Sequence, residues 1–412
     1  MRIAYVCADS GVPVFGRKGC SVHVQEMIRA FRRGGAQVEI FAAAAEGSPP
    51  PELDRGGGGL RIHRLPAARA ADPGRTAVEV LNRAIADGLS QAGTFDLVYE
   101  RYSLWSAAAM EHARAAGVPA LLEVNAPLIE EQAEHRGLRD ARGAAAIAGR
   151  VFSAATALLA VSAEVAAWLG RQPGALSRVH LVPNGVDPQR FRPDVTPALP
   201  PAPGSFTVGF VGSMKRWHGL AVLIEAFALL HERVPASRLL LVGDGPEQAA
   251  IRVDLAKRGL TKATHFTGSA VPEDVPALLT SMDACAAPYP DAKGFYFSPL
   301  KVYEYLASGR AVVASRVGQV AAIVRHEIDG LLCPPGDAVA FAAALERLHS
   351  DPALRARLGA AARANAVEHH SWDARAATII ALARAAPGGG GGAGGAGGAG
   401  GAAPTRDQAV EA

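Results

Sequence analysis

The chain has 412 residues, which is enough for two domains that each bury a core of their own. Hydrophobic residues make up 49% and charged residues 20%, a balance that excludes a disordered or fibrous protein. The net charge of +3 comes without a dense block of Lys and Arg, so nucleic acid is not an expected partner.

The N-terminus is predicted to be a β-strand that runs into a glycine-containing loop, not a signal peptide. No stretch reaches about 18 uninterrupted apolar residues, so no membrane span is expected. The cysteines, Cys7, Cys20, Cys285 and Cys333, lack C-x-x-C spacing, which argues against a zinc site or a disulfide framework. We therefore expect a cytoplasmic protein.

Short β-branched segments alternate with longer amphipathic segments along the first half of the chain. The strands predicted there are residues 3–7, 38–42, 97–99, 120–123 and 158–161. This alternation is the signature of βαβ units and parallel sheets. A proline-rich stretch, residues 183–203, then interrupts the pattern and predicts an interdomain linker.

The second half of the chain restarts the same pattern. Its predicted strands are residues 207–211, 238–242, 265–266, 284–287, 311–314 and 330–332. We predict an α/β fold with an N-terminal domain at 1–187, a linker at 188–204, a C-terminal domain at 205–386 and a Gly/Ala-rich tail at 387–412. The last helix of the second domain is a candidate to cross back to the first. Two doubly wound domains leave a cleft between their strand ends, where such sheets bind ligands.

The segment SPLKVYEYLASGRAVVAS, residues 298–315, combines the features of an anion site. Ser298 and Pro299 suit the cap and the first position of a helix, whose free amides and dipole attract a diphosphate. Lys301 and Glu304 share one face, so Lys301 would add charge while Glu304 accepts hydrogen bonds from ribose hydroxyls. The alternative is an ordinary amphipathic helix with a surface ion pair.

This segment resembles the donor-binding helix of family 4 glycosyltransferases, which are retaining enzymes of the GT-B fold. Further blocks follow in the family's order: FGRKGCSVHV (15–24), DLVYERYS (96–103), LLEVNAP (121–127), VPNGVD (182–187), FVGSMKRWHG (210–219), LVGDGP (241–246) and FTG (266–268). The resemblance covers about residues 1–375. It implies two Rossmann-like domains facing a central cleft, with the acceptor bound by the first and a nucleotide sugar by the second.

The resemblance implies that Gly19 covers the donor diphosphate from the first domain, because a glycine before a helix lets the backbone approach a phosphate closely. A tight turn is the alternative reading of Gly19. The donor-binding residues implied by the whole resemblance are Gly19, Gly212, Lys215, Arg216, His218, Gly243, Gly245, Tyr296, Ser298, Pro299, Leu300, Lys301 and Glu304.

The loop FVGSMKRWHG departs from the family pattern. The family carries an Arg and a Lys at the positions of Ser213 and His218, and both neutralise the leaving diphosphate. We predict that Lys215, with Arg216, supplies this charge instead, the alternative being that both are solvated loop charges. Trp217 is predicted to be a packing residue.

Two further positions depart from the family. Tyr296 replaces the first of two Glu residues separated by seven positions, of which Glu304 is the second, and its ring is predicted to stack on a sugar face. Asn125 stands where many relatives carry a His. A neutral amide can orient a hydroxyl but cannot act as a general base near neutral pH. The predicted catalytic residues are therefore Lys215, Glu304 and Asn125.

The acceptor side is predicted to comprise His23, Arg101, Glu123 and Asn125. Glu123 would position substrate, or would be a buried structural carboxylate paired with Arg101. His23 would face the cleft, or would be a core or surface histidine with satisfied hydrogen bonds.

We therefore predict a retaining glycosyltransferase that moves a sugar from a nucleoside diphosphate sugar to a sugar, glycolipid or small-molecule acceptor, in cell-envelope glycan or glycolipid assembly. No metal and no cofactor are expected. The alternatives are a sugar-nucleotide 2-epimerase and a non-catalytic scaffold. A basic face formed by Arg136, Arg139, Arg142 and Arg150 offers peripheral contact with the inner membrane face, or is simply solvated.

Overall fold

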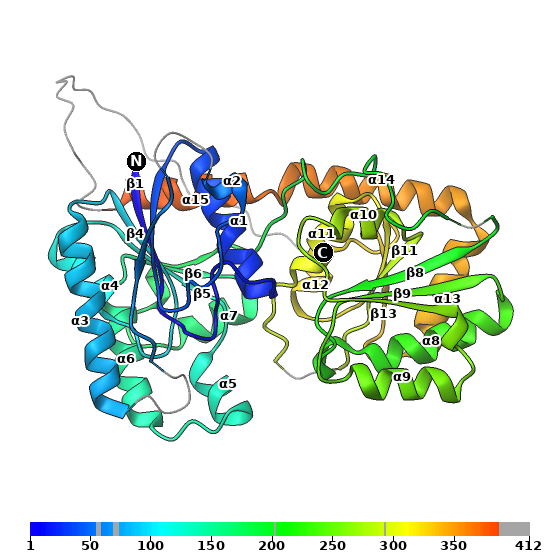
Figure 1. The fold of residues 1–412 in the computed structure, drawn as a ribbon, viewed down its shortest axis with the longest axis horizontal. Helices are drawn as coiled ribbons and strands as arrows, with labels where there is room; N and C mark the ends of the chain where they lie inside the picture. Colours follow the sequence, from blue (N-terminus) through cyan, green and yellow to red (C-terminus); the bar gives the residue numbers. More distant parts are fainter. Residues whose placement is uncertain (55–58, 69–73, 202, 292–293, 387–412) are drawn as a thin grey trace, which may run out of the picture.

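The computed structural model describes residues 1–54, 59–68, 74–201, 203–291 and 294–386. Two α/β domains lie side by side along the long axis of the molecule, each with helices on both faces of a parallel sheet (Figure 1). The predicted fold class, two Rossmann-like doubly wound domains, is confirmed. The predicted tail at 387–412 lies outside the described residues.

The first sheet has the strand order β3-β2-β1-β4-β5-β6-β7, and its neighbouring strands run parallel. The strands are β1 (Arg2–Cys7), β2 (Gln37–Ala42), β3 (Arg61–Arg64), β4 (Leu97–Arg101), β5 (Ala120–Val124), β6 (Ala157–Ala160) and β7 (Val179–Leu181). The helices are α1 (Gly19–Arg33), α2 (Pro51–Asp54), α3 (Gly74–Ala92), α4 (Ala108–Ala115), α5 (Leu128–His135), α6 (Ala141–Ala154) and α7 (Ala163–Gly170). The strand order reverses between β1 and β4, which is where such sheets bind ligands.

The second sheet has the order β10-β9-β8-β11-β12-β13 and reverses between β8 and β11. Its strands are β8 (Phe206–Val211), β9 (Ser237–Val242), β10 (Thr264–Gly268), β11 (Ala284–Ala287), β12 (Ala311–Ser315) and β13 (Leu331–Cys333). The helices that follow the linker are α8 (Leu220–Arg233), α9 (Gln248–Lys257), α10 (Val275–Thr280), α11 (Leu300–Ala307), α12 (Gly318–Ile323), α13 (Ala338–Ser350), α14 (Pro352–His369) and α15 (Trp372–Ala385).

The core of the first domain is divided by the sheet, because successive side chains of a strand point to opposite faces. Ala4 and Val6 of β1 pack in the cluster that includes α3, α4 and α6. Ile3 and Tyr5 pack in the cluster on the other face, with α1 and α15. Both faces are apolar, which is why the strands of this sheet are almost continuously hydrophobic in the sequence.

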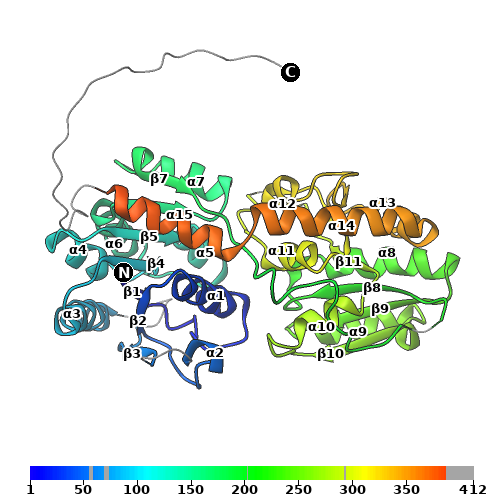
Figure 2. The same ribbon diagram turned by 90° about the horizontal axis from the view of Figure 1, so that it is seen from above.

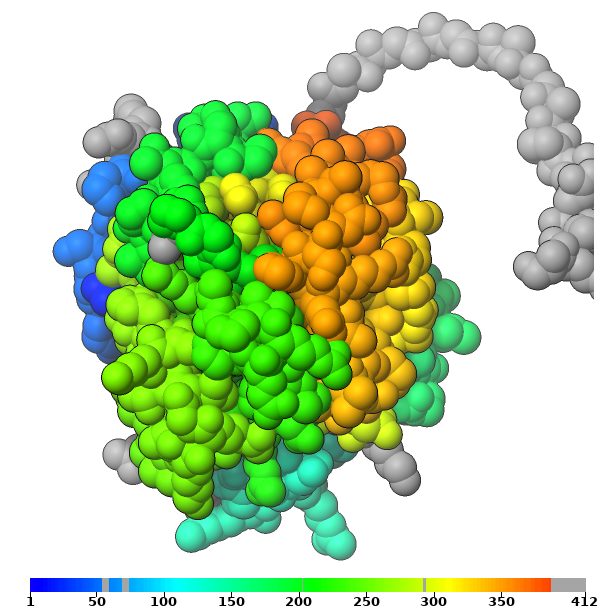
Figure 3. Space-filling model, turned by 90° about the vertical axis from the view of Figure 1, so that its right-hand side faces the viewer, coloured from blue at the N-terminus to red at the C-terminus, as the bar shows by residue number. Residues whose placement is uncertain are grey.

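The last two helices run along both domains, and Figure 2 shows α14 over the second domain continuing into α15 over the first. Trp372, at the start of α15, is buried in the core of the first domain. At the far end of the second domain, α13 packs beside α8. The space-filling view of this end in Figure 3 shows green and orange parts of the second domain side by side on the surface. Helix α15 therefore ties the C-terminal end of the described chain to the N-terminal domain.

All the predicted strands are present, and two strands were missed. Strand β3 has the sequence RIHR and β7 has only three residues, and both are edge strands with partly exposed side chains. Such strands carry little of the apolar pattern that identifies a buried strand. Within the described part of the chain, no helix is both long enough and apolar enough to cross a bilayer.

Candidate active site

Helix α11 begins directly after the loop that ends at Pro299, and its first turn has no side-chain cap. Ser298 does not cap the helix as predicted. Its Oγ accepts a hydrogen bond from the backbone N–H of Asn184 at 3.1 Å, and its carbonyl oxygen accepts from Asn184 Nδ2 at 2.6 Å. Ser298 thus holds the loop to the interdomain linker, and the first amides of α11 remain available to a ligand.

The first turns of α1 and α11 come together from the two domains. Gly19 is the first residue of α1, and a methyl group added to it would lie 3.9 Å from Leu300 Cδ1 at the start of α11. Because each helix N-terminus carries a partial positive charge, their meeting place favours an anion. The structure thus brings together Gly19, Pro299 and Leu300, which the sequence analysis assigned to the donor.

Lys301 is buried with 8% of its surface exposed, and its Nζ lies 3.9 Å from the centre of the Phe210 ring. No hydrogen-bond partner for this Nζ occurs among the described residues. Burial lowers the pKa of Lys301 to about 7, although Glu304 acts in the opposite direction. A buried ammonium without a hydrogen-bond partner is costly, and an anionic ligand would relieve that cost.

Glu304 lies one turn further along α11. Burial raises the pKa of this carboxyl to about 7, and Arg190 is the main group that opposes the rise. Arg190 comes from the linker and also donates to Glu26 of α1. Arg190 was not among the predicted site residues, because a linker arginine belongs to no recognisable motif and the fold brings it to Glu304.

Three glycines allow the loops at this edge of the second sheet to approach each other. A Cβ on Gly212 would lie 2.7 Å from Lys301 Nζ, and one on Gly243 would lie 2.0 Å from the carbonyl oxygen of Gly212. A Cβ on Gly245 would come within 2.6 Å of the Met214 backbone. The predicted donor loops are therefore in mutual contact, and larger side chains at these positions would separate them.

The two cations predicted in the loop after β8, Lys215 and Arg216, are less buried than Lys301. Lys215 Nζ lies 4.7 Å from the centre of the Trp217 ring, and Arg216 is exposed in a short 3-10 helix, Arg216–His218. Trp217 is 42% exposed, so its prediction as a packing residue is wrong. Burial, with the charge of Lys301, lowers the pKa of His218 to about 3. His218 is therefore neutral and does not replace the cation that the family carries at its position.

Glu123 is the centre of a buried polar cluster at the end of β5. Its carboxylate accepts hydrogen bonds from His23 Nε2 at 2.8 Å, Arg101 at 3.2 Å, Asn125 Nδ2 at 2.6 Å and the hydroxyl of Tyr99. Burial opposes ionisation, but His23, Arg101 and these hydrogen bonds together lower the pKa of Glu123 to about 2. All four residues of the predicted acceptor side lie together. Tyr99 was not among the predicted site residues, because it lies inside strand β4 and no motif indicates a polar role for it.

This cluster should stabilise the protein in a pH-dependent way. Since folding lowers the pKa of Glu123 from 4.5 to about 2, its contribution is present above pH 4.5 and is lost as the pH falls toward 2. The full shift corresponds to about 3 kcal/mol. We expect Glu123→Gln to lower the free energy of unfolding by about this amount at pH 7, measured by chemical denaturation. The deficit should shrink between pH 4.5 and 3, whereas the exposed control Glu46→Gln should show none. A deficit that does not change with pH would contradict the assignment.

Tyr296 joins the two domains. Its hydroxyl donates to Glu131 Oε2 of α5 at 2.8 Å, and its ring packs against apolar residues of the first domain. The predicted stacking of this ring on a sugar stays a prediction, but its hydroxyl group is directed at α5.

The Tyr296 contact can be tested with a double-mutant cycle. Tyr296→Phe and Glu131→Ala should each lower the free energy of unfolding by about 1.5 kcal/mol, because each removes the same hydrogen bond, from the Tyr296 hydroxyl to the Glu131 carboxylate. The double variant should lower the free energy of unfolding by no more than either single variant does. Thermal unfolding of the four proteins measures the coupling, and strictly additive losses would show that the two residues act separately.

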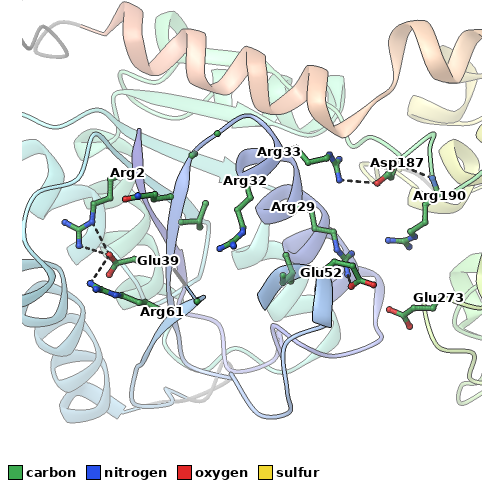
Figure 4. Close-up of a pocket in the computed structure, with 16 residues that line it drawn as sticks. Arg2, Arg29, Arg32, Arg33, Glu39, Glu52, Arg61, Asp187, Arg190 and Glu273 are labelled. Atoms are coloured by element: carbon green, nitrogen blue, oxygen red, sulfur yellow. Dashed lines mark hydrogen bonds and ion pairs between the residues drawn. The ribbon is translucent and has the colours of Figure 1, made fainter. Parts of the chain in front are cut away.

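A groove of about 1040 Å³ lies away from these residues, along the C-terminal half of α1 (Figure 4). Its arginines are mostly held by carboxylates that Figure 4 also shows: Arg2 pairs with Glu39 at 2.6 Å, and Arg33 pairs with Asp187 at 3.1 Å. We interpret the groove as a network of ion pairs. Arg190 lines the groove and also lowers the pKa of Glu304 in the candidate site, so the two regions adjoin at this residue.

The described residues contain no group of three or more His, Cys, Asp and Glu side chains placed to hold a metal ion. The polar groups at the meeting of the two domains include the first amides of α1 and α11, the buried Lys301, and Glu304 close to Arg190. This set suits a phosphorylated ligand bound by helix starts and a protein cation.

Two Rossmann-like domains that face each other form the GT-B fold of glycosyltransferases, and comparison with known proteins specifies the family. Residues 18–185 match the glycosyl transferase 4-like domain, and residues 205–351 match the glycosyl transferases group 1. The chain belongs to glycosyltransferase family 4, and it is a transferase.

Among named relatives, the D-inositol 3-phosphate glycosyltransferase of Xylanimonas cellulosilytica is 30% identical over 391 residues, covering 88% of this chain and 90% of that protein. The enzyme of the same name from Pseudarthrobacter chlorophenolicus is 27% identical over 388 residues, covering 88% and 89%. Among solved structures, sucrose-phosphate synthase from Thermosynechococcus elongatus superposes with a TM-score of 0.71 at 23% identity, over 93% of this chain and 98% of that one. HepE from Anabaena, solved with UDP and glucose, superposes with a TM-score of 0.68 at 18% identity, over 92% of this chain and 98% of that one. These structures share the fold.

Proposed function

We propose that this protein is a retaining glycosyltransferase that moves a sugar from a nucleoside diphosphate sugar to an acceptor hydroxyl. The observation that carries the proposal is the buried Lys301 ammonium, which has no hydrogen-bond partner among the described residues and lies at the facing starts of α1 and α11. A diphosphate supplies the missing negative charge and accepts hydrogen bonds from the free amides. Family membership and a fold shared with a UDP-bound structure support a nucleotide sugar as the ligand.

Each donor residue then has a defined role. The amides of α11 and Lys301 bind the diphosphate, Gly19 approaches it from the first domain, and Glu304 accepts hydrogen bonds from the ribose hydroxyls. Lys215 and Arg216, on the loop after β8, remain proposed as secondary cations that act if the loop moves when the donor binds.

The proposed reaction retains the configuration of the sugar. The acceptor oxygen attacks the anomeric carbon on the face that the diphosphate leaves, the bond from that carbon to the phosphate oxygen breaks, and a phosphate oxygen takes the acceptor proton. No protein base is required. Glu123, whose pKa is about 2, is too weak a base for the task near neutral pH.

Acceptor identity is proposed from the relatives. Two proteins that match most of the chain are named as glycosyltransferases of D-inositol 3-phosphate, so a small polyol or its phosphate is the first acceptor to test. A role in cell-envelope assembly at the cytoplasmic membrane face is the second possibility. In the basic face that favours it, Arg136 lies 3.7 Å from Glu131 and Arg150 lies 2.7 Å from Glu111, so part of its charge is already neutralised.

The first experiment is a thermal-shift panel of UDP, GDP and ADP and their sugars, with and without Mg²⁺. We expect one diphosphate series to raise the melting temperature by several degrees, as a ligand at about 100 times its Kd adds roughly 2.7 kcal/mol. Mg²⁺ should not be needed, because Lys301 and the helix amides supply the positive charge. No shift with any nucleotide would overturn the proposed donor site, and a shift only with Mg²⁺ would overturn metal independence.

A further inference from the structure

The charge on Glu123 determines how the side chain of Asn125 is turned. An ionised carboxylate only accepts hydrogen bonds, so every polar group in contact with it must donate. Asn125 therefore presents its Nδ2 to Glu123 Oε1, at 2.6 Å, and turns its Oδ1 away. The two atoms of an amide are hard to distinguish by shape, but here the chemistry of the partner decides between them.

Asn125 is connected to the candidate donor site through Glu123 and His23. It follows β5 at the carboxyl end of the strand and is only half-buried, whereas Glu123 is 3% exposed. The same carboxylate accepts from His23, one turn into α1, and the first residue of that helix faces Leu300 of α11. One hydrogen-bonded unit therefore links Asn125 to the helix start that would cover the diphosphate.

We propose that Glu123 is a positioning residue that turns the Asn125 carbonyl oxygen toward the cleft, so that the site selects a substrate hydroxyl there. This inference rests on the proposed function. A hydroxyl can donate to the carbonyl oxygen, whereas a carboxylate or phosphate oxygen would be repelled by it and would leave it unpaired. The hydroxyl belongs either to the donor sugar or to the acceptor.

Substrates that lack single hydroxyls test the proposal. UDP-glucose and its 2-, 3-, 4- and 6-deoxy analogues are compared with myo-inositol 3-phosphate as acceptor, and UDP release is measured. The converse arm uses UDP-glucose with deoxy analogues of the inositol phosphate. We expect kcat/KM of the wild type to fall at least tenfold for one analogue in one arm, which identifies the source of the hydroxyl.

The variants connect this selectivity to the two residues. Asn125→Ala should lower kcat/KM at least tenfold for the parent substrate. Its kcat/KM should then be the same for the parent substrate and for the deoxy analogue that the wild type uses poorly. In Glu123→Gln the Asn125 amide is free to turn, so kcat/KM for the parent substrate and for the same analogue should differ by less than threefold. Tyr99→Phe removes a different donor to Glu123 and should keep the wild-type selectivity. A wild-type kcat/KM that falls equally for all analogues, or a Glu123→Gln variant that keeps the wild-type discrimination while its kcat/KM falls, would show a merely structural role and overturn the proposal.

A measurement without substrate separates this inference from the proposed function. In ¹⁵N-labelled protein, the side-chain amide signal of Asn125, identified by its absence from Asn125→Ala, should be protected from hydrogen exchange. Protection should fall at least tenfold in Glu123→Gln, provided that the variant keeps the wild-type backbone spectrum. If the backbone spectrum of Glu123→Gln changes, Arg101→Lys is the alternative variant. It keeps the Glu123 carboxylate, so the Asn125 side-chain amide should remain protected from exchange. An unprotected Asn125 amide in the wild type would overturn the inference even if the nucleotide panel succeeds, and failure of that panel alone would overturn only the donor assignment.

Discussion

Replacing Lys301 with Met should lower kcat/KM for the nucleotide sugar by about 10- to 100-fold, because a charged hydrogen bond to the diphosphate is worth roughly 1.5–3 kcal/mol. The same change should not lower the stability of the free protein, since Met keeps the apolar stem over Phe210 and removes a buried charge without a hydrogen-bond partner. Calorimetric titration should show the loss for UDP but not for uridine, which has no phosphate.

The exposed lysine of α9, changed in Lys257→Met, is the matched control and should leave activity unchanged. Wild-type kinetics in Lys301→Met would refute the role of Lys301. The affinity for UDP should also depend on pH. Because burial lowers the pKa of Lys301 to about 7, the free site loses its positive charge as the pH rises, and affinity should fall between pH 7 and 9.

Replacing Glu304 with Ala should lower donor use at least tenfold, because the ribose hydroxyls would lose a charged hydrogen-bond acceptor. The loss should be large for UDP and small for inorganic pyrophosphate, which carries no ribose. Steady-state kinetics and competition binding measure the two effects. Glu304→Gln keeps one carbonyl oxygen and should retain more activity than Glu304→Ala.

Glu225→Ala, at an exposed position of α8, is the control for a lost surface carboxylate and should behave as the wild type does. Equal losses for UDP and pyrophosphate in Glu304→Ala would mean that the residue acts on the phosphates or on the fold, and would remove it from the ribose site.

Much of the fold could be predicted because buried strands are apolar over several consecutive residues and alternate with amphipathic helices. The two missed strands, β3 and β7, lie at opposite edges of the first sheet, where fewer side chains are buried. Ser298 was misassigned for a different reason. Its position before a helix suits a cap, but a linker amide 114 residues away in sequence uses the hydroxyl instead.

The sequence by itself determined the two-domain α/β fold, the family, and the placement of Lys301 and Glu304 on one helix face, because helical spacing and strand pattern depend only on near neighbours. Only the tertiary structure decided which of these groups are charged and what they face. The hydrogen bond of Tyr296 to Glu131 joins residues 165 apart, and that of Glu123 to His23 joins residues 100 apart. Burial and long-range contacts set the pKa values and the side-chain directions of the site, and neither follows from the spacing of residues along the chain.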